Sequence, residues 1–134
     1  MSFDDMTDYV LHRTAIERRA EAVHWLQETL TAFAKCLTPS EAQRLALELP
    51  APASQWIRDV EHECMLGRPE ELYALVQRHL ASTLGVAVER TQVAITAMAQ
   101  ALRAETLRWL ARRMGDPWKD LLRESAPSRV QRRW

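Results

Sequence analysis

Residues 30–50 read LTAFAKCLTPSEAQRLALELP. Within them, Thr38 and Glu41 flank Pro39 with the spacing of a capping box. In that motif the hydroxyl accepts a hydrogen bond from the third helical amide, and the carboxylate accepts one from the amide of the capping residue. Proline suits the first helical position because the N–H that it lacks would have no partner there. The stretch therefore predicts that one helix ends near Leu37 and that another begins at Pro39.

An apolar stripe runs upstream of this turn. Its members recur every three or four residues, which places them on one face of a helix over about residues 17–37: Val23, Leu26, Leu30, Phe33 and Leu37. Downstream, Pro50 and Pro52 are predicted to end the next helix, and a short helix is predicted over about residues 52–65. A Gly-Arg-Pro sequence at residues 67–69 then interrupts the chain.

The pattern starts again after this break, which indicates an internal duplication. An ungapped shift of 65 residues superimposes identical residues: Thr31-Ala32, Ala34, Leu37, Leu45-Ala46 and Pro52 on Thr96-Ala97, Ala99, Leu102, Leu110-Ala111 and Pro117. The helix over 17–37 then corresponds to one over about 82–102. Asp116 and Pro117 are predicted to start a last helix that ends near Glu124.

These elements predict an all-α fold, a pseudo-symmetric helical bundle made of two duplicated units. The units span about residues 3–65 and 68–124 of a single domain over 1–124, and residues 125–134 are expected to form a mobile tail. Neither unit can bury its apolar stripe alone, so both must share one core. Its expected members are Leu30, Leu37, Leu45, Leu49, Ile95, Leu102 and Leu110.

The composition is that of an ordinary globular chain. Of 134 residues, 47% are hydrophobic and 27% are charged, values that favour neither disorder nor a membrane protein. No apolar run approaches the roughly 20 residues of a membrane-spanning helix. The acidic start of the chain lacks the basic and apolar segments of a secretory signal. We therefore expect no membrane association and a cytoplasmic location.

The formal net charge is zero, but the charges are unevenly distributed. Residues 1–102 contain nine basic and fourteen acidic residues, a balance of −5, whereas residues 103–134 contain nine and four, a balance of +5. Such asymmetry can steer a partner or a second copy of the chain, although solvated helix faces also produce it.

The spacing within residues 30–50 also resembles a known signature. Leu30-x-x-Phe33-x-x-x-Leu37-Thr38-x-x-Glu41-Ala42-x-x-Leu45-x-x-x-Leu49-Pro50 is similar to the motif of the bacterial domain of unknown function 2267 family. The resemblance implies a duplicated helical fold over nearly the whole chain, and it supplies no activity and no catalytic residue. In the second unit, Arg103-Ala104-Glu105 stands in place of the capping turn and Met114-Gly115 in place of Leu-Pro.

The densest group of potential metal ligands is Glu61-His62-Glu63-Cys64. Side chains two apart on a helix point away from each other, so a metal there would need ligands from elsewhere. Histidine and carboxylate recur at helical spacing, His12 with Asp8 and His24 with Glu28, and surface ion pairs explain both. No phosphate-binding loop or nucleophile motif occurs. We expect no metal and no cofactor, and the sequence identifies no catalytic residue.

Tryptophan and arginine supply the candidates for a contact surface. Trp25 and Trp109 lie beside the apolar stripes, where an aromatic side chain flanks the core or marks an interface, and the first role is favoured. Trp56 and Trp118 are predicted to close the ends of the bundle. The candidates for partner contact are Trp25, Trp109, Arg129, Arg132, Arg133 and Trp134.

Two classes of function fit these features. The first is a non-enzymatic module for protein–protein interaction or self-association, which needs no catalytic residue. The alternative is a small-molecule binding protein, or an enzyme, with a cavity between the two helical units. Nucleic-acid binding is not favoured, because the tail is basic but the body of the chain is not.

Overall fold

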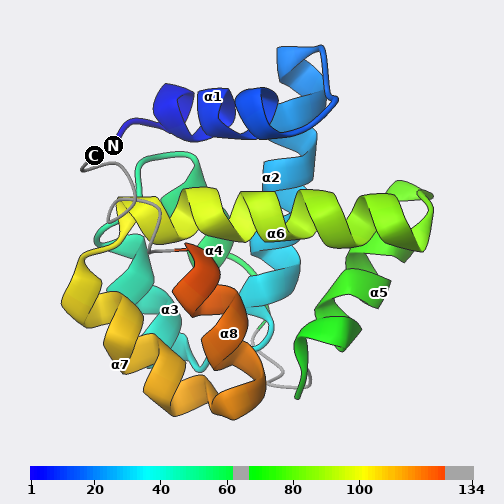
Figure 1. The fold of residues 1–134 in the computed structure, drawn as a ribbon. Helices are drawn as coiled ribbons and strands as arrows, with labels where there is room; N and C mark the ends of the chain where they lie inside the picture. The colour runs from blue at the N-terminus through cyan, green and yellow to red at the C-terminus, as the bar shows by residue number, and fades with distance from the viewer. Residues whose placement is uncertain (62–66, 126–134) are drawn as a thin grey trace, which may run out of the picture.

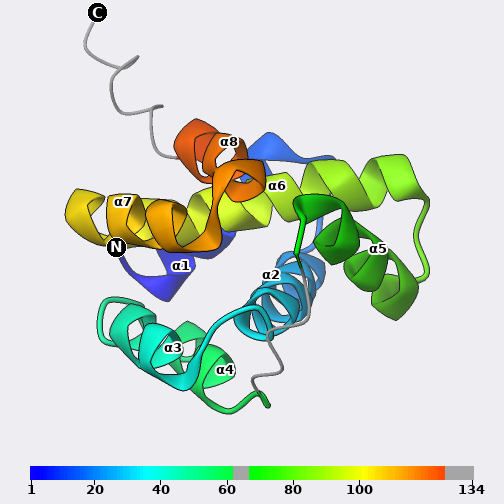
Figure 2. The same ribbon diagram turned by 90° about the horizontal axis from the view of Figure 1, so that it is seen from below.

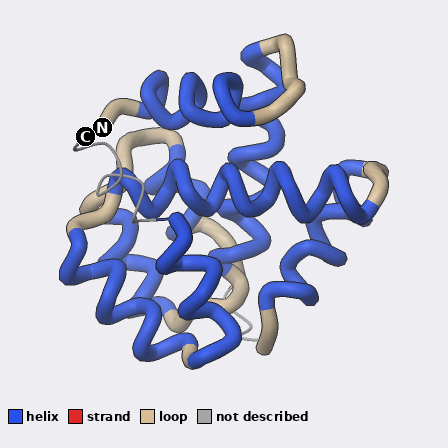
Figure 3. Tube along the Cα trace, viewed as in Figure 1, coloured by secondary structure: helices blue, strands red, loops and turns tan. Residues whose placement is uncertain are grey.

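The computed structural model of the protein describes residues 1–61 and 67–125, which form eight helices and no strand (Figure 1, Figure 3). The helices are α1 (Phe3–Arg13), α2 (Arg19–Ala34), α3 (Pro39–Ala46), α4 (Ala53–Arg58), α5 (Pro69–Leu80), α6 (Leu84–Ala101), α7 (Ala104–Met114) and α8 (Asp116–Ser125). The all-α fold is therefore confirmed. Residues 62–65 of the predicted short helix and residues 126–134 of the predicted tail lie outside the described residues.

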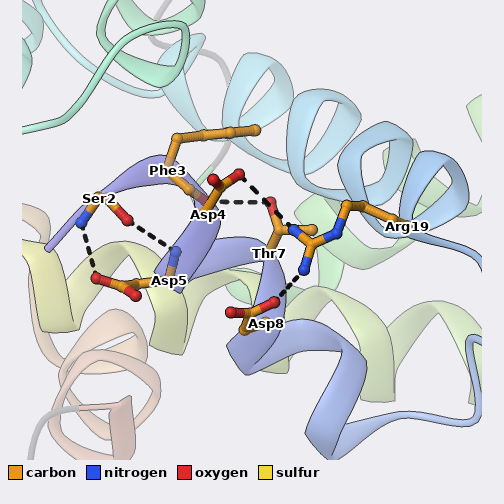
Figure 4. A network of polar contacts seen from close by, with 7 residues as sticks. All are labelled: Ser2, Phe3, Asp4, Asp5, Thr7, Asp8 and Arg19. Carbon is orange, nitrogen blue, oxygen red and sulfur yellow. Dashed lines mark hydrogen bonds and ion pairs between the residues drawn. The ribbon is translucent and has the colours of Figure 1, made fainter.

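Local capping fixes where helices begin. The capping box predicted at the start of α3 is present: Thr38 Oγ1 accepts from Glu41 N at 3.2 Å, and Glu41 Oε1 accepts from Thr38 N at 2.8 Å. Ser2 and Asp5 exchange the same two hydrogen bonds at the start of α1 (Figure 4). Arg19, the first residue of α2, pairs with Asp8 of α1 and so ties these two helices together.

Helices α2 and α6 cross at the centre of the molecule (Figure 1, Figure 2). Each also packs against the last helix of its own half, α2 against α4 and α6 against α8. The first helix of each half reaches across to the other half, because α1 packs on α6 and α5 packs on α2. The two halves are thus interlocked around a common core.

The second half repeats the helix order of the first. Helices α2 and α6 begin at residues 19 and 84, and α3 and α7 begin at residues 39 and 104, so both pairs are 65 residues apart. Two cation–π contacts also join positions 65 apart, Arg90 over Trp25 and Arg44 over Trp109. When a two-fold axis relates two units, a residue near the axis contacts the residue at the equivalent position of the other unit. These contacts support the duplicated, pseudo-symmetric arrangement, which remains our interpretation.

The core contains the side chains that the sequence predicts. All seven are buried, with exposed fractions from 0% to 6%: Leu30, Leu37, Leu45, Leu49, Ile95, Leu102 and Leu110. Trp118 is 1% exposed, packs edge-on against Phe33 at 5.9 Å between ring centroids, and donates from Nε1 to the Gly67 carbonyl at 3.2 Å. Trp118 therefore closes one end of the core, as expected.

Helix α5 ends in an unfavourable backbone conformation at Ala81, whose φ and ψ are 49° and 44°. A Cβ in this left-handed region crowds the following carbonyl, and glycine has no such contact. We expect Ala81→Gly to raise the free energy of unfolding by about 0.5–1 kcal/mol. Chemical denaturation measures the change. Ala74→Gly, at an exposed position inside the same helix, should instead lower it by about 1 kcal/mol. A loss of stability in both variants would contradict the expectation.

Candidate functional site

An open hollow of about 590 Å³ lies beside α2 and α4. Its lining residues come from α2 and its C-terminal cap, from α4 and from the segment after α4: Gln27, Thr31, Lys35, Trp56, Asp59, Val60 and Glu61. All of them belong to the first unit, so this hollow is not the cavity between units that the sequence offered as an alternative. Glu61 is the described member of the predicted Glu61–Cys64 cluster, and the other three lie outside the described residues.

Helices α3 and α7 are joined by polar side chains along a seam. Their backbones hardly approach each other, yet Arg113 Nε donates to Glu41 Oε2 at 2.5 Å. Farther along the seam, the Glu48 carboxylate accepts from Arg103 N at 2.8 Å and from Thr106 Oγ1 at 2.6 Å. The first unit thus contributes two glutamates, Glu41 and Glu48, that bind α7 or its N-cap in the second unit.

Glu48 supplies a cap that the second unit lacks. At the 65-residue offset, Thr38 and Glu41 correspond to Arg103 and Thr106, which cannot form the carboxylate half of a capping box. Glu48 Oε1 accepts from the Arg103 amide in the way that Glu41 Oε1 accepts from the Thr38 amide. A side chain of the first unit therefore caps the first turn of α7 in the second unit.

Both seam glutamates are held in the ionised form. Burial raises the pKa of Glu41, but hydrogen bonds from Thr38 and Arg113 outweigh burial, and the resulting pKa is below the usual range. Burial likewise raises the pKa of Glu48, and hydrogen bonds from Thr106 and Arg103 lower it overall. The carboxylates are favoured because these donors bind the charged form more strongly than the neutral one.

The outer side of α7 carries a cluster of four residues, here named the α7 arginine face: Arg108, Trp109, Arg112 and Arg113. Trp109 is half-buried, with the guanidinium of Arg44 at 4.0 Å and that of Arg113 at 5.6 Å from its ring centroid. Arg108 and Arg112 lie one turn apart on α7 and are exposed. Neither forms an ion pair with a residue in the described part of the chain. The face is therefore positive, with an accessible indole among its charges.

A family model described as Uncharacterized conserved protein (DUF2267) matches residues 3–121. The chain belongs to the DUF2267 family. This confirms the resemblance seen in residues 30–50. No curated protein and no solved structure matches the chain significantly.

Two of the predicted contact residues of this DUF2267 chain, Trp25 and Trp109, differ in how far they are exposed. Trp25 is 4% exposed within the core, and the guanidinium of Arg90 lies 5.1 Å from its ring centroid. It therefore offers almost no surface to a partner. Trp109 remains partly accessible. The other four candidates, Arg129, Arg132, Arg133 and Trp134, lie outside the described residues.

The arginines beside Trp109 were not among the predicted contact residues. Charged residues on a helix usually form a solvated face, and their sequence does not show whether acidic neighbours neutralise them. The available signal was the spacing of Arg112 and Arg113, three and four residues after Trp109, which places two cations beside that tryptophan on one helix face. Only the packed structure shows that Arg113 pairs with Glu41, whereas Arg108 and Arg112 form no ion pair with a described residue.

The histidines pair differently from the prediction. His12 Nδ1 lies 2.7 Å from the Asp8 backbone oxygen, whereas the Asp8 carboxylate pairs with the start of α2. Glu28 Oε1 lies 3.3 Å from His79 Nδ1 on α5, so the predicted pairing with His24 is wrong. Spacing along one helix does not show which helix packs opposite it.

No metal centre or membrane-spanning element is found in residues 1–61 and 67–125. No group of three or more His, Cys, Asp or Glu side chains there could hold a metal ion. None of the helices described combines the length and hydrophobicity needed to cross a bilayer.

Proposed function

We propose that this DUF2267 chain is a non-enzymatic interaction module that contacts an acidic protein surface through the α7 arginine face. The observation that carries the proposal is the exposure of Arg108 and Arg112, without an ion pair to any described residue, beside the half-buried Trp109. Tryptophan and arginine are the residues most enriched in binding hot spots. Charges of one sign on such a face select a partner of the opposite sign and speed the encounter.

A second copy of the chain can supply the acidic surface. In the first turn of α1, Asp4 and Asp5 are exposed, and the side chain of Asp4 is 87% exposed. The opposite balances of residues 1–102 and 103–134 favour such an association between copies. The partner is therefore an acidic protein or another molecule of this chain, and salt should weaken the contact in either case.

The double substitution Arg108→Glu with Arg112→Glu tests this proposal. We expect it to weaken self-association or partner capture by about tenfold or more, because it replaces attraction with repulsion at two positions. Light scattering at low and at roughly 0.15 M ionic strength measures self-association. Capture of proteins from a host extract on the immobilised chain measures partner binding.

The matched control is Arg18→Glu with Arg78→Glu, which changes the net charge equally at two exposed arginines away from α7, one at the N-cap of α2 and one on α5. This control should retain binding. If the α7 variant and the wild type associate equally in both measurements, the α7 arginine face is not the contact surface. Loss of DNA or RNA binding in the α7 variant would assign the face to nucleic acid instead. Deletion of residues 125–134 separately tests the predicted contribution of the tail.

A further inference from the structure

We propose that the hollow between α2 and α4 is a binding site for a basic amino acid, either free or at the C-terminus of a peptide. The site is separate from the proposed interaction surface, because none of the residues that line it belongs to α7. Three observations support it. Polar groups line the α2 side of the hollow, an indole and two carboxylates line the other side, and the charges of the lining residues are the inverse of those of a basic amino acid.

One side of the hollow is formed by α2. Gln27, Thr31 and Lys35 follow one another at intervals of four residues, so they lie on one helix face over roughly 12 Å. They present an amide, a hydroxyl and an ammonium group. None of the three side chains forms a hydrogen bond or ion pair with another described residue. Their hydrogen-bonding capacity is therefore available to a ligand.

The other side contains an indole and two carboxylates. The Trp56 ring packs edge-on against Phe3 of α1, with 5.5 Å between centroids and 82° between planes, so a second helix fixes its orientation. Asp59 and Glu61 follow α4, line the same hollow and are exposed. Neither carboxylate pairs with a cation in the described part of the chain. An aromatic face beside carboxylates is suited to a guanidinium or ammonium group.

The charges of the hollow are the inverse of those of a basic amino acid. One ammonium and two carboxylates line it, from Lys35, Asp59 and Glu61. Free arginine and free lysine carry two cationic groups and one carboxylate, which match these groups one to one, and an arginine or lysine at a peptide C-terminus retains its side-chain cation and the carboxylate. A phosphate or nucleotide would instead face two carboxylates, and a neutral ligand would leave the charges unmatched. The volume of about 590 Å³ lies within the range of small-molecule sites.

Isothermal titration calorimetry of the full chain with L-arginine tests the site. We expect saturable binding, with citrulline and agmatine each about tenfold weaker or more, because the first lacks the guanidinium charge and the second lacks the carboxylate. The tripeptide Gly-Gly-Arg and its C-terminal amide distinguish a free amino acid from a peptide C-terminus as the ligand. Tighter binding of the tripeptide than of free arginine, abolished by amidation, identifies a peptide terminus. The reverse order identifies the free amino acid.

Two substitutions in the hollow give the proposal its sharpest test. Asp59→Asn and Lys35→Gln should each weaken arginine binding by about tenfold. Glu89→Gln, at an exposed position on α6 with no ion pair among the described residues, should leave it unchanged. Circular dichroism verifies that each variant is folded.

Absence of measurable heat with arginine at millimolar concentration would overturn the proposal. Equal binding of arginine and citrulline, or arginine binding that both hollow variants retain, would do so as well. The α7 variant serves as a further control, since it should bind arginine normally. Failure of the ligand site and failure of the interaction surface are thereby distinguishable.

Discussion

Replacing Leu37 or Leu102 with alanine should lower the free energy of unfolding by about 2–5 kcal/mol. The two residues are 0% and 3% exposed and occupy equivalent positions before α3 and α7. Truncation removes buried carbon atoms from the core and leaves a cavity that the surrounding helices only partly fill. Because the halves share one core, a cavity in either half should destabilise the whole chain.

Chemical denaturation measures this loss, and Leu47→Ala provides the matched control. Leu47 is 78% exposed, so the same chemical change there should alter stability by less than about 0.5 kcal/mol. Comparable losses from Leu37→Ala and Leu47→Ala would contradict the assignment of Leu37 to the core. A cooperative single transition in both core variants is also expected.

Glu48→Gln should lower the free energy of unfolding by about 2 kcal/mol at neutral pH. The Glu48 side chain is 11% exposed and accepts from Arg103 N and from Thr106 Oγ1. Glutamine preserves the shape, but it loses the charge that strengthens both hydrogen bonds, and its NH₂ group cannot accept from Thr106. Glu89→Gln, the same change at an exposed position, should alter stability by less than about 0.5 kcal/mol. Equal effects of the two substitutions would exclude a capping role for Glu48.

The same seam should make the fold sensitive to acid. The pKa values of Glu41 and Glu48 are lowered in the folded chain, so the folded state binds fewer protons at these sites than the unfolded state does. The stabilisation is fully present above the ordinary pKa of glutamate and is lost as the pH falls through the lowered values. Urea denaturation between about pH 7 and about pH 3 should show this loss. The slope should be shallower in Glu48→Gln, and an unchanged slope would mean that Glu48 does not contribute.

The end of the first long helix shows how far local patterns extend. The stripe predicts a helix through Leu37, but α2 ends at Ala34. Cys36 N and Leu37 N donate to carbonyls three residues earlier, at 2.9 Å and 3.1 Å. The chain thus makes a tighter turn, with hydrogen bonds three residues apart, before the capping box of α3. Leu37 is nevertheless buried in the core. Burial follows from the apolar spacing even where the regular helix has ended.

The sequence by itself determined the all-α class, the start of α3 at its capping box and the seven buried core positions. Its 65-residue offset also predicts a helix over about residues 82–102, where α6 spans Leu84–Ala101. These features depend on residues three or four positions apart, or on the comparison of the chain with itself. Both are readable along the chain because helix hydrogen bonding and amphipathicity are local.

Only the tertiary structure decided which distant groups meet. Glu48 caps Arg103 from 55 positions away, and Arg90 covers Trp25 while Trp109 stays half-buried. The residues that line the hollow likewise come together only when α4 packs against α2. The physical reason is that a side chain's partners depend on which helix faces it, and sequence spacing within one helix leaves that choice open.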